Sequence, residues 1–305
     1  MGIPQKVRMV EVGPRDGLQN EKSVLETEDK FQYISMLKDA GLKTIEVTSF
    51  VKPPAIPQMR DAVELFTMVR DRIGLKDMNF PCLVPNMIGY EKAKSLGVKE
   101  IALFTATSDS FTKKNVNASV DETFERMKEV AEEAKKDNIR MRGYISTAFG
   151  CPYEGRMEVG KLISVAERFL KLGVYEVSVG DTIGVATPLQ VKSYLKDFLK
   201  AVPLEQSAMH FHDTRGMALS NITVSLEEGI SVFDSSSGGL GGCPYAKGAT
   251  GNVATEDVWY LLQSYGIDTG LDIQKLAEAS AFILGKVQRS TESKFLKAYQ
   301  STGKV

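Results

Sequence analysis

Short, continuous apolar runs and longer stretches with a helical spacing of apolar residues follow one another along the whole chain. Short β-branched and aliphatic runs predict strands, and the stretches between them place apolar residues at i, i+3 and i+4, which predicts amphipathic helices. Val191, Tyr194, Leu195 and Phe198 follow this helical spacing. Eight strands are predicted, over residues 7–12, 44–48, 79–84, 100–105, 140–146, 175–180, 208–212 and 231–235.

A short repeat of glycine, an aliphatic residue, two variable positions and a β-rich run occurs four times. The copies begin at Gly41, Gly97, Gly173 and Gly229, directly before the second, fourth, sixth and eighth predicted strands. A glycine at this place closes a helix in the left-handed conformation, and the strand follows at once. The repeat therefore consists of two successive strand–helix units.

Eight strand–helix units predict an α/β protein with a closed (β/α)8 or TIM barrel. We expect the barrel to form one catalytic domain over residues 1–265, and residues 266–305 to add a C-terminal helical appendage packed on it. The alternative is an open doubly wound sheet, which would carry a glycine-rich dinucleotide fingerprint after the first strand. The first predicted strand is not followed by such a fingerprint.

The charge balance is nearly neutral, with 38 Lys and Arg against 39 Asp and Glu and a formal net charge of -1. This balance indicates neither a nucleic-acid partner nor a membrane surface. The chain has no apolar run of transmembrane length and no signal-peptide pattern, so a cytoplasmic protein is expected. Three cysteines are too few for a disulfide framework, which favours a reducing compartment.

Polar residues stand where most of the predicted strands end. In a barrel of this kind the catalytic groups lie at the carboxyl ends of the strands, so these residues are expected to meet at one mouth above an apolar interior. They are Arg15 and Asp16 after the first strand, Glu46 and Ser49 at the second, Asn86 after the third, Ser146 and Thr147 at the fifth, Asp181 and Thr182 after the sixth, and His210 and His212 in the seventh.

The chain contains only two histidines, His210 and His212, and a strand places residues i and i+2 on the same face. Two imidazoles that point at one site are typical of metal ligation. Asp16 offers a carboxylate near them, and Asn252 offers an amide oxygen from the loop after the last strand. Two nitrogen and two oxygen donors suit Mg²⁺ or Mn²⁺, with Zn²⁺ or Co²⁺ as substitutes.

Three further residues are candidates for chemistry at the mouth. The guanidinium of Arg15 is suited to hold a developing oxyanion by paired hydrogen bonds. Residues 238–252 form a glycine-dense segment without the ending of a nucleotide P-loop, which we interpret as a mobile lid. The tetrapeptide Gly-Cys-Pro-Tyr occurs twice, so the residues alone nominate Cys151 and Cys243 about equally as reactive thiols.

Several segments together resemble the 3-hydroxy-3-methylglutaryl-CoA lyase family, in order and over about residues 7–290. They are Val-Glu-Val-Gly-Pro-Arg-Asp-Gly-Leu-Gln-Asn-Glu at 10–21, Ile-Glu-Val-Thr-Ser-Phe at 45–50, Gly-Cys-Pro-Tyr-Glu-Gly at 150–155, Gly-Asp-Thr-Ile-Gly at 180–184, His-Phe-His-Asp-Thr at 210–214, and the segment 238–252. The last segment separates the lyases from their condensing relatives. The resemblance implies metal-dependent cleavage of 3-hydroxy-3-methylglutaryl-CoA to acetyl-CoA and acetoacetate, a step of leucine degradation and ketone-body formation.

The same resemblance implies roles for individual residues. The metal ligands would be Asp16, His210, His212 and Asn252. Arg15 would bind substrate and stabilise the enolate oxygen, Cys243 rather than Cys151 would return a proton to carbon, and His210 would be one acceptor for the hydroxyl proton. Glu46 and Asp181 are expected to handle protons or to support the site, and Thr182 and Asn86 to contact the substrate.

Four alternatives remain open at this level. One is a lyase for a related 3-hydroxyacyl-CoA, such as citramalyl-CoA, and another is a Claisen-type transferase that joins acetyl-CoA to a 2-oxo acid. The third is a non-catalytic barrel stabilised by metal, and the fourth is a metal-dependent hydrolase. A barrel with an added C-terminal helix often pairs, so a homodimer is expected.

Overall fold

The computed structural model describes residues 2–52, 56–242 and 251–302. Eleven strands lie within these ranges, and two of them, β7 and β8, form a small separate hairpin. The strands are β1 (Arg8–Glu11), β2 (Thr44–Ile45), β3 (Thr48–Ser49), β4 (Cys82–Leu83), β5 (Glu100–Ala106), β6 (Arg140–Ser146), β7 (Gly150–Cys151), β8 (Gly155–Arg156), β9 (Glu176–Asp181), β10 (Ser207–Phe211) and β11 (Val232–Ser235).

The other nine strands run parallel in the order β2-β1-β11-β10-β9-β6-β5-β4-β3. The two end strands of this sheet, β2 and β3, are halves of one extended segment, residues 44–49. The Glu46 N–H donates to the Glu11 carbonyl on one side (2.9 Å), and the Val47 N–H donates to the Pro81 carbonyl on the other (3.0 Å). The sheet therefore closes into an eight-stranded barrel, and the predicted fold and all eight predicted strands are confirmed.

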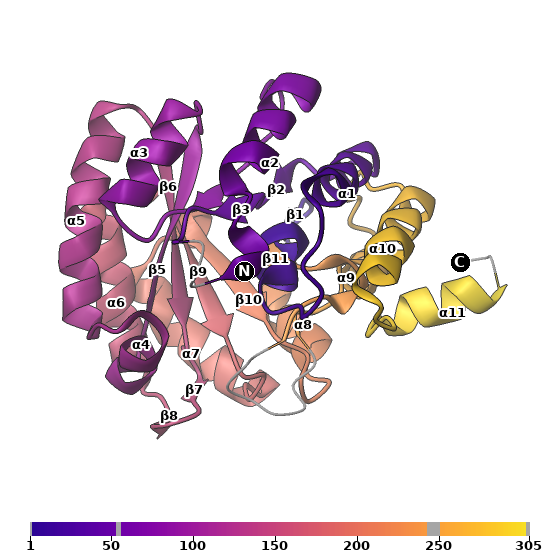
Figure 1. Ribbon diagram of the computed structural model, residues 1–305. Helices are drawn as coiled ribbons and strands as arrows, with labels where there is room; N and C mark the ends of the chain where they lie inside the picture. The colour runs from indigo at the N-terminus through magenta and orange to yellow at the C-terminus, as the bar shows by residue number, and fades with distance from the viewer. Residues whose placement is uncertain (1, 53–55, 243–250, 303–305) are drawn as a thin grey trace.

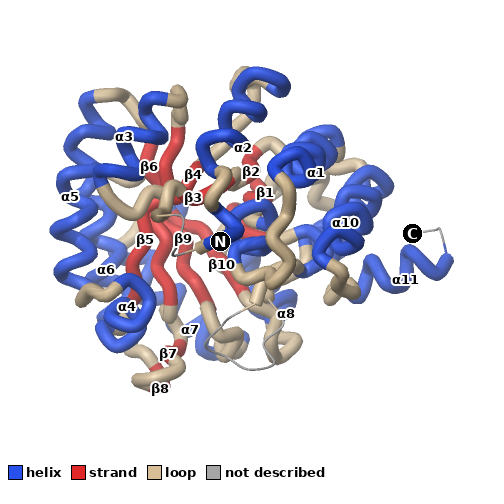
Figure 2. Tube along the Cα trace, viewed as in Figure 1, coloured by secondary structure: helices blue, strands red, loops and turns tan. Residues whose placement is uncertain are grey.

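Helices cover the outside of the barrel wall (Figures 1 and 2). The four predicted glycine closures are confirmed: Gly41, Gly97, Gly173 and Gly229 have φ angles of 103°, 81°, 89° and 93°. The α-helices of the eight units are α1 (Thr27–Asp39), α2 (Ala62–Met68), α3 (Met87–Ser95), α4 (Asp109–Val116), α5 (Val120–Lys136), α6 (Val159–Leu172), α7 (Pro188–Ala201), α8 (Ala218–Glu227) and α9 (Thr255–Ser264).

Two more helices follow the eighth unit, α10 (Ile273–Val287) and α11 (Lys294–Thr302). Helix α10 lies beside α1 in Figure 1, and the Asp272 N–H donates to the Ala40 carbonyl at 2.9 Å. The carboxylate of Asp257 holds the start of α11, because it accepts from the Ser293 hydroxyl (2.7 Å) and the Phe295 N–H (2.8 Å). The expected C-terminal helices are thus present, and α10 contacts α1 while α11 contacts α9.

The main core lies between the barrel wall and the helices, and it is apolar. The barrel interior is different, because Arg142 of β6 reaches across it to Asp234 of β11, and both side chains are fully buried. The expectation of an apolar interior is therefore wrong for this part of the barrel, although Val10, which pairs in register with Asp234, packs in a small apolar cluster with Val12, Ala208 and Val232. A buried arginine is tolerated there because Asp234 and Glu176 both pair with its guanidinium.

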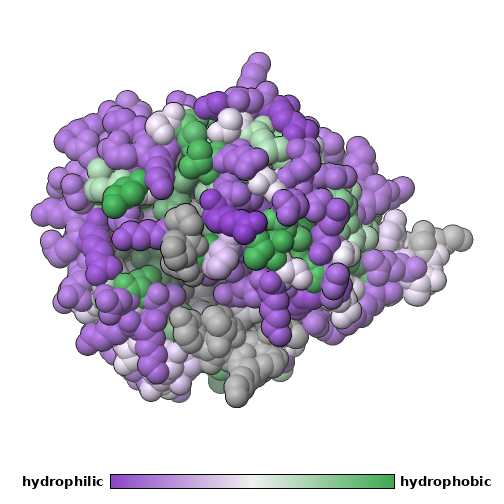
Figure 3. Space-filling model, viewed as in Figure 1, coloured by the Kyte–Doolittle hydropathy of each residue, from purple (hydrophilic) through white to green (hydrophobic). Residues whose placement is uncertain are grey.

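The outer surface is mostly hydrophilic on the face drawn in Figure 3, where hydrophobic side chains form small, separate patches. Among the described residues, no helix is both long and apolar enough to cross a membrane.

Candidate metal centre

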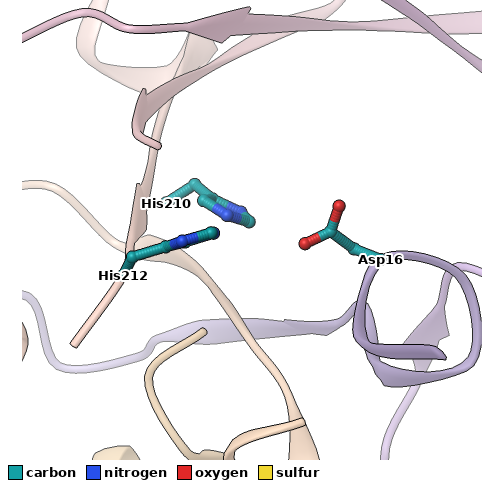
Figure 4. A group of neighbouring side chains, drawn as sticks. All are labelled: Asp16, His210 and His212. Atoms are coloured by element: carbon teal, nitrogen blue, oxygen red, sulfur yellow. The ribbon is translucent and has the colours of Figure 1, made fainter. Parts of the chain in front are cut away.

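Three side chains from two segments that are far apart along the chain converge at the carboxyl ends of the strands. Asp16 lies in the turn after β1, His210 lies in β10, and His212 directly follows β10. One ligand atom from each lies within 4.8 Å of the other two. In Figure 4 the two imidazole rings lie side by side and point toward the Asp16 carboxylate.

Asp16 is presented by η1 (Gly13–Gly17), a single π-helical turn in which the Asp16 N–H donates to the Val12 carbonyl at 2.7 Å. This turn is pressed against its neighbours, so it needs its glycines. A Cβ atom on Gly13 would lie 2.3 Å from the Tyr33 hydroxyl, and one on Gly17 would lie 2.7 Å from the Ser236 hydroxyl. The absence of both side chains therefore lets Asp16 sit close to the last strand.

Asn252 is brought to the same place by a short antiparallel pairing with the end of β10. The Val253 N–H donates to the Phe211 carbonyl at 3.0 Å, and Asn252 pairs with His212. The Asn252 amide nitrogen donates to Asp16 Oδ2 (2.9 Å) and to the Leu240 carbonyl (3.1 Å). Both N–H donors are thus occupied, and the buried Oδ1 has no partner among the described residues.

The donor set fits a divalent cation. His212 Nδ1 and Asn252 Oδ1 are buried polar atoms without partners in the described part of the chain, and such atoms are costly unless they gain a ligand. Burial raises the pKa of Asp16, but the charge of the neighbouring Arg15 outweighs burial and brings the net value down to about 2. Asp16 is therefore an ionised oxygen donor beside two imidazoles.

The two histidines differ in their surroundings. Burial lowers the pKa of His210, but a hydrogen bond to Asp234 and the charge of that residue outweigh burial and raise it overall. Burial and the neighbouring His210 lower the pKa of His212 to about 4. Neutral imidazole is the form that binds metals, and His212 is held in that form.

Arg15 lies directly beside this cluster, and its guanidinium is held by two carboxylates. Nη1 donates to Asp16 Oδ1 and Nη2 lies against Glu46 Oε2, both at 2.7 Å. Its Nε is buried and has no partner among the described residues. One donor of a fixed guanidinium is thus left for another acceptor.

Glu46 faces the barrel interior, where its Oε2 also accepts from the Tyr144 hydroxyl at 3.2 Å. Burial raises the pKa of Glu46 in spite of its pairing with Arg15. The Arg15 guanidinium also lies 5.3 Å from the centre of the Tyr144 ring. Glu46 and Tyr144 together therefore restrict the position of Arg15.

Other predicted site residues have local partners instead. The Asp181 carboxylate accepts from the N–H groups of Val185 (2.9 Å) and Ala186 (3.0 Å), and burial raises its pKa to about 6. The Thr182 hydroxyl accepts from the Thr147 N–H at 2.8 Å. Asn86 caps α3, where its side chain accepts from the Gly89 N–H at 3.1 Å. No hydrogen bond or ion pair in the described ranges joins these three side chains to the cluster.

The two candidate thiols cannot be compared directly, because Cys243 lies outside the described residues. Cys151 is buried in β7, and its Sγ lies 3.0 Å from the Ser108 hydroxyl. That hydroxyl in turn donates to Glu154 at 2.6 Å. Cys151 is therefore part of the packing that holds the β7–β8 hairpin to the start of α4.

Sequence reasoning missed Tyr144, Arg142 and Asp234, which lie below the cluster inside the barrel. A strand points alternate residues to one side, so Arg142 and Tyr144 share the inner face of β6. This alternation could have predicted that Arg142 and Tyr144 face the barrel interior. Their partners in other strands, Glu46 and Asp234, were not readable from spacing along the chain.

The HMGL-like family model matches residues 6–283 of this chain. The human mitochondrial hydroxymethylglutaryl-CoA lyase is 49% identical over 296 residues, which are 97% of this chain and 90% of that protein.

Solved structures show the same similarity. The crystal structure of hydroxymethylglutaryl-CoA lyase from Pseudomonas aeruginosa has a TM-score of 0.95 and 48% identity, with 99% of each chain covered. An HMG-CoA lyase from Acinetobacter baumannii, solved in complex with coenzyme A and 3-methylmalate, has a TM-score of 0.92 and 35% identity, with 99% of this chain and 97% of that chain covered.

Proposed function

The chain belongs to the HMGL-like family, and on that premise we propose that it is a carbon–carbon lyase that cleaves 3-hydroxy-3-methylglutaryl-CoA to acetyl-CoA and acetoacetate. Near-full-length identity of 49% to a hydroxymethylglutaryl-CoA lyase supports the reaction. The observation in the molecule that carries the proposal is the convergence of Asp16, His210 and His212 beside the fixed guanidinium of Arg15.

We assign the cation to Asp16, His210, His212 and Asn252, whose two nitrogens and two oxygens suit Mg²⁺ or Mn²⁺, with Zn²⁺ or Co²⁺ as substitutes. Bound there, the cation supplies Lewis acidity, which lowers the pKa of the tertiary hydroxyl of the substrate. The proposed ligands come from both ends of the barrel sequence, so a closed barrel is needed to assemble them.

Arg15 binds the thioester oxygen of the substrate. As the bond between the CH₂ carbon and the tertiary carbon breaks, its electron pair moves toward the thioester, and the oxygen becomes that of an enolate. The buried Nε donor of Arg15 stabilises this charge without reorganisation, because Asp16 and Glu46 already hold the guanidinium. Arg15 thus acts on charge that exists only as the bond breaks.

The hydroxyl proton goes to a carboxylate. His210 was expected as one acceptor, but its Nδ1 lies 3.2 Å from Asp234, so no free nitrogen remains once the other nitrogen ligates the cation. We assign Asp181 as the acceptor, because it pairs in register with Phe211, the residue between the two histidines, and burial raises its pKa to about 6. Cys243 then gives its thiol proton to the CH₂ carbon, which completes acetyl-CoA.

Thr182 and Asn86 remain proposed substrate contacts at the rim of the mouth. Their side-chain oxygens already accept from the Thr147 and Gly89 N–H groups, which would hold them in place for a ligand. We also propose that residues 1–265 are the catalytic domain. The appendage supports it, since Arg289 Nη1 donates to the Gly241 carbonyl at 3.2 Å, at the base of the glycine-dense segment.

Acetoacetate formation tests the reaction directly. The protein is treated with chelator, supplied with Mg²⁺ or Mn²⁺ and incubated with 3-hydroxy-3-methylglutaryl-CoA. We expect equal amounts of acetoacetate and acetyl-CoA with either metal and neither product without metal. Free CoA in place of acetyl-CoA would mean hydrolysis. Turnover of citramalyl-CoA alone would change the substrate, and no turnover of either ester would refute the lyase.

We propose a cytoplasmic homodimer as the working form. The described cysteines, Cys82 and Cys151, are free and buried, as a reducing compartment favours. Helix α11 projects from the barrel in Figure 1 and carries Phe295 and Tyr299, which stack at 5.8 Å beside the 56% exposed Tyr260. This aromatic group is a suitable self-association surface. Light scattering on the protein as it elutes from a size-exclusion column measures its mass, which should be that of two chains.

A further inference from the structure

A fully buried carboxylate, Asp234, lies behind one of the two histidines. It projects from β11 into the barrel, and its Oδ2 lies 3.2 Å from His210 Nδ1. The arrangement is not repeated at His212, whose Nδ1 is buried without a partner in the described part of the chain. One proposed ligand therefore has an orienting carboxylate and the other does not.

Three donors hold the Asp234 carboxylate in place. Arg142 Nη2 donates to Oδ1 at 2.7 Å and Nη1 to Oδ2 at 3.3 Å, while the Ser178 hydroxyl donates to Oδ2 at 2.7 Å. Glu176 Oε1 accepts from Arg142 Nε at 2.7 Å and so fixes the guanidinium from its other edge. All four side chains are at most 1% exposed, so water does not compete for these bonds.

The direction of these bonds decides where the proton on His210 lies. Both oxygens of Asp234 accept from the always charged guanidinium of Arg142, and Oδ2 also accepts from Ser178, so the group that faces His210 is a carboxylate that only accepts. Nδ1 of His210 must therefore carry a hydrogen. In a neutral ring the other nitrogen then keeps its lone pair.

We propose that Asp234 is a positioning residue that holds His210 as the Nδ1–H tautomer and keeps its other ring nitrogen open toward Asp16 and His212. Arg142 and Ser178 act through Asp234 by donating to its carboxylate. The tautomer depends only on the chain, whereas its effect on turnover rests on the proposed function. Carboxylates that orient ligand histidines typically change metal affinity about 10- to 100-fold when removed.

Asp234→Asn gives a directional test because Arg142 dictates how the new amide lies. We expect the amide oxygen to face Arg142 Nη2, which lies at 2.7 Å against 3.3 Å for Nη1. The Ser178 hydroxyl can turn to accept from the NH₂ group, which then takes the place of Oδ2. That group donates to His210 Nδ1 and forces the hydrogen onto the other nitrogen, which closes it to metal. Glu176→Gln is the matched control, since it makes the same change in the same network without touching His210.

Nitrogen-15 NMR of histidine-labelled protein reads the tautomer in the metal-free chain. The chain has only two histidines, so His212→Gln suffices to assign the spectrum. Above about pH 8, where an unperturbed imidazole is neutral, we expect the Nδ1–H form at His210 in the wild type and in Glu176→Gln. The opposite tautomer, or a doubly protonated ring, in the wild type would overturn the proposal even if no variant folds.

Calorimetric titration with Mn²⁺ gives the second measurement. We expect Asp234→Asn to bind about 10- to 100-fold more weakly and Glu176→Gln to bind within about threefold of the wild type. Equal affinity of a folded Asp234→Asn, or equal loss in both variants, would overturn the positioning role. If the wild type binds Mn²⁺ with the expected tautomer but cleaves no CoA ester, the proposed function fails and Asp234 keeps its role.

Discussion

The amide nitrogen of Asn252 donates to Oδ2 of Asp16 at 2.9 Å, so the loop after the last strand is tied directly to the turn after the first. The Asn252 oxygen faces away from this bond and is left buried without a partner in the described ranges. The bond thus selects which end of the amide is available for a cation.

Asn252→Ala should therefore weaken Mn²⁺ binding by more than about tenfold, because it removes a ligand and frees Asp16 to rotate. Titration calorimetry on the chelator-treated variant measures the affinity. Circular dichroism of the same sample shows whether the fold is retained. An unchanged affinity would remove Asn252 from the ligand set.

Arg15→Lys should lower kcat by about 100- to 1000-fold, because one ammonium cannot bridge Asp16 and Glu46 and also donate to the substrate oxygen. The affinity of this variant for Mn²⁺ should stay within a few-fold of the wild type. Steady-state kinetics and calorimetric titration therefore separate a role of Arg15 in catalysis from a role in metal binding. Arg8→Lys is the control at the opposite end of the barrel, where Arg8 pairs with Glu176. A full rate in Arg15→Lys would contradict the assignment.

Gly251→Ala should weaken metal binding although position 251 carries no ligand. A Cβ atom there would lie 2.3 Å from the carbonyl carbon of Gly241, so the two backbones must separate and Asn252 must shift with them. The Gly160→Ala substitution in α6 is the control, because its Cβ meets nothing within 4 Å. Comparable Mn²⁺ affinities in the two variants would show that the contact is dispensable.

Stability should fall as pH rises from about 4.5 to 7, in part because of Glu256. Burial raises the pKa of this carboxyl to about 7, against the lowering effect of bonds from the Ser280 hydroxyl and the Gly238 N–H. Between these pH values Glu256 keeps its proton in the folded chain and has released it in the unfolded chain. Its contribution to the free energy of unfolding is therefore complete below pH 4.5 and is lost as the pH rises through 7. This loss of unfolding free energy from Glu256 amounts to at most about 3 kcal/mol.

Glu256→Gln removes this titration and should flatten the pH dependence of the unfolding free energy. Urea denaturation below pH 4.5 and above pH 7 measures this pH dependence. Glu227→Gln, at an exposed position of α8, should keep the wild-type slope. If Glu256→Gln keeps that slope as well, the carboxyl is ionised in the folded protein and the buried site accommodates its charge.

The sequence by itself determined the barrel and the nature of its mouth. Two hydrophobic periods and four glycine closures were enough to predict eight strands, because each depends only on neighbours along the chain. The histidine pair was readable for the same reason, since His210 and His212 are two residues apart in one strand. Asp16 followed from the rule that the strand ends meet at one mouth.

Only the tertiary structure decided what stands behind those ligands. Arg142 and Asp234 are 92 residues apart, and nothing in their local sequence links them. Closing the barrel makes them face each other across its interior, and the low dielectric there makes the pair strong enough to hold Asp234 against His210. Local spacing thus predicts which residues reach the mouth, while the closed sheet determines which atoms of those residues are free to bind.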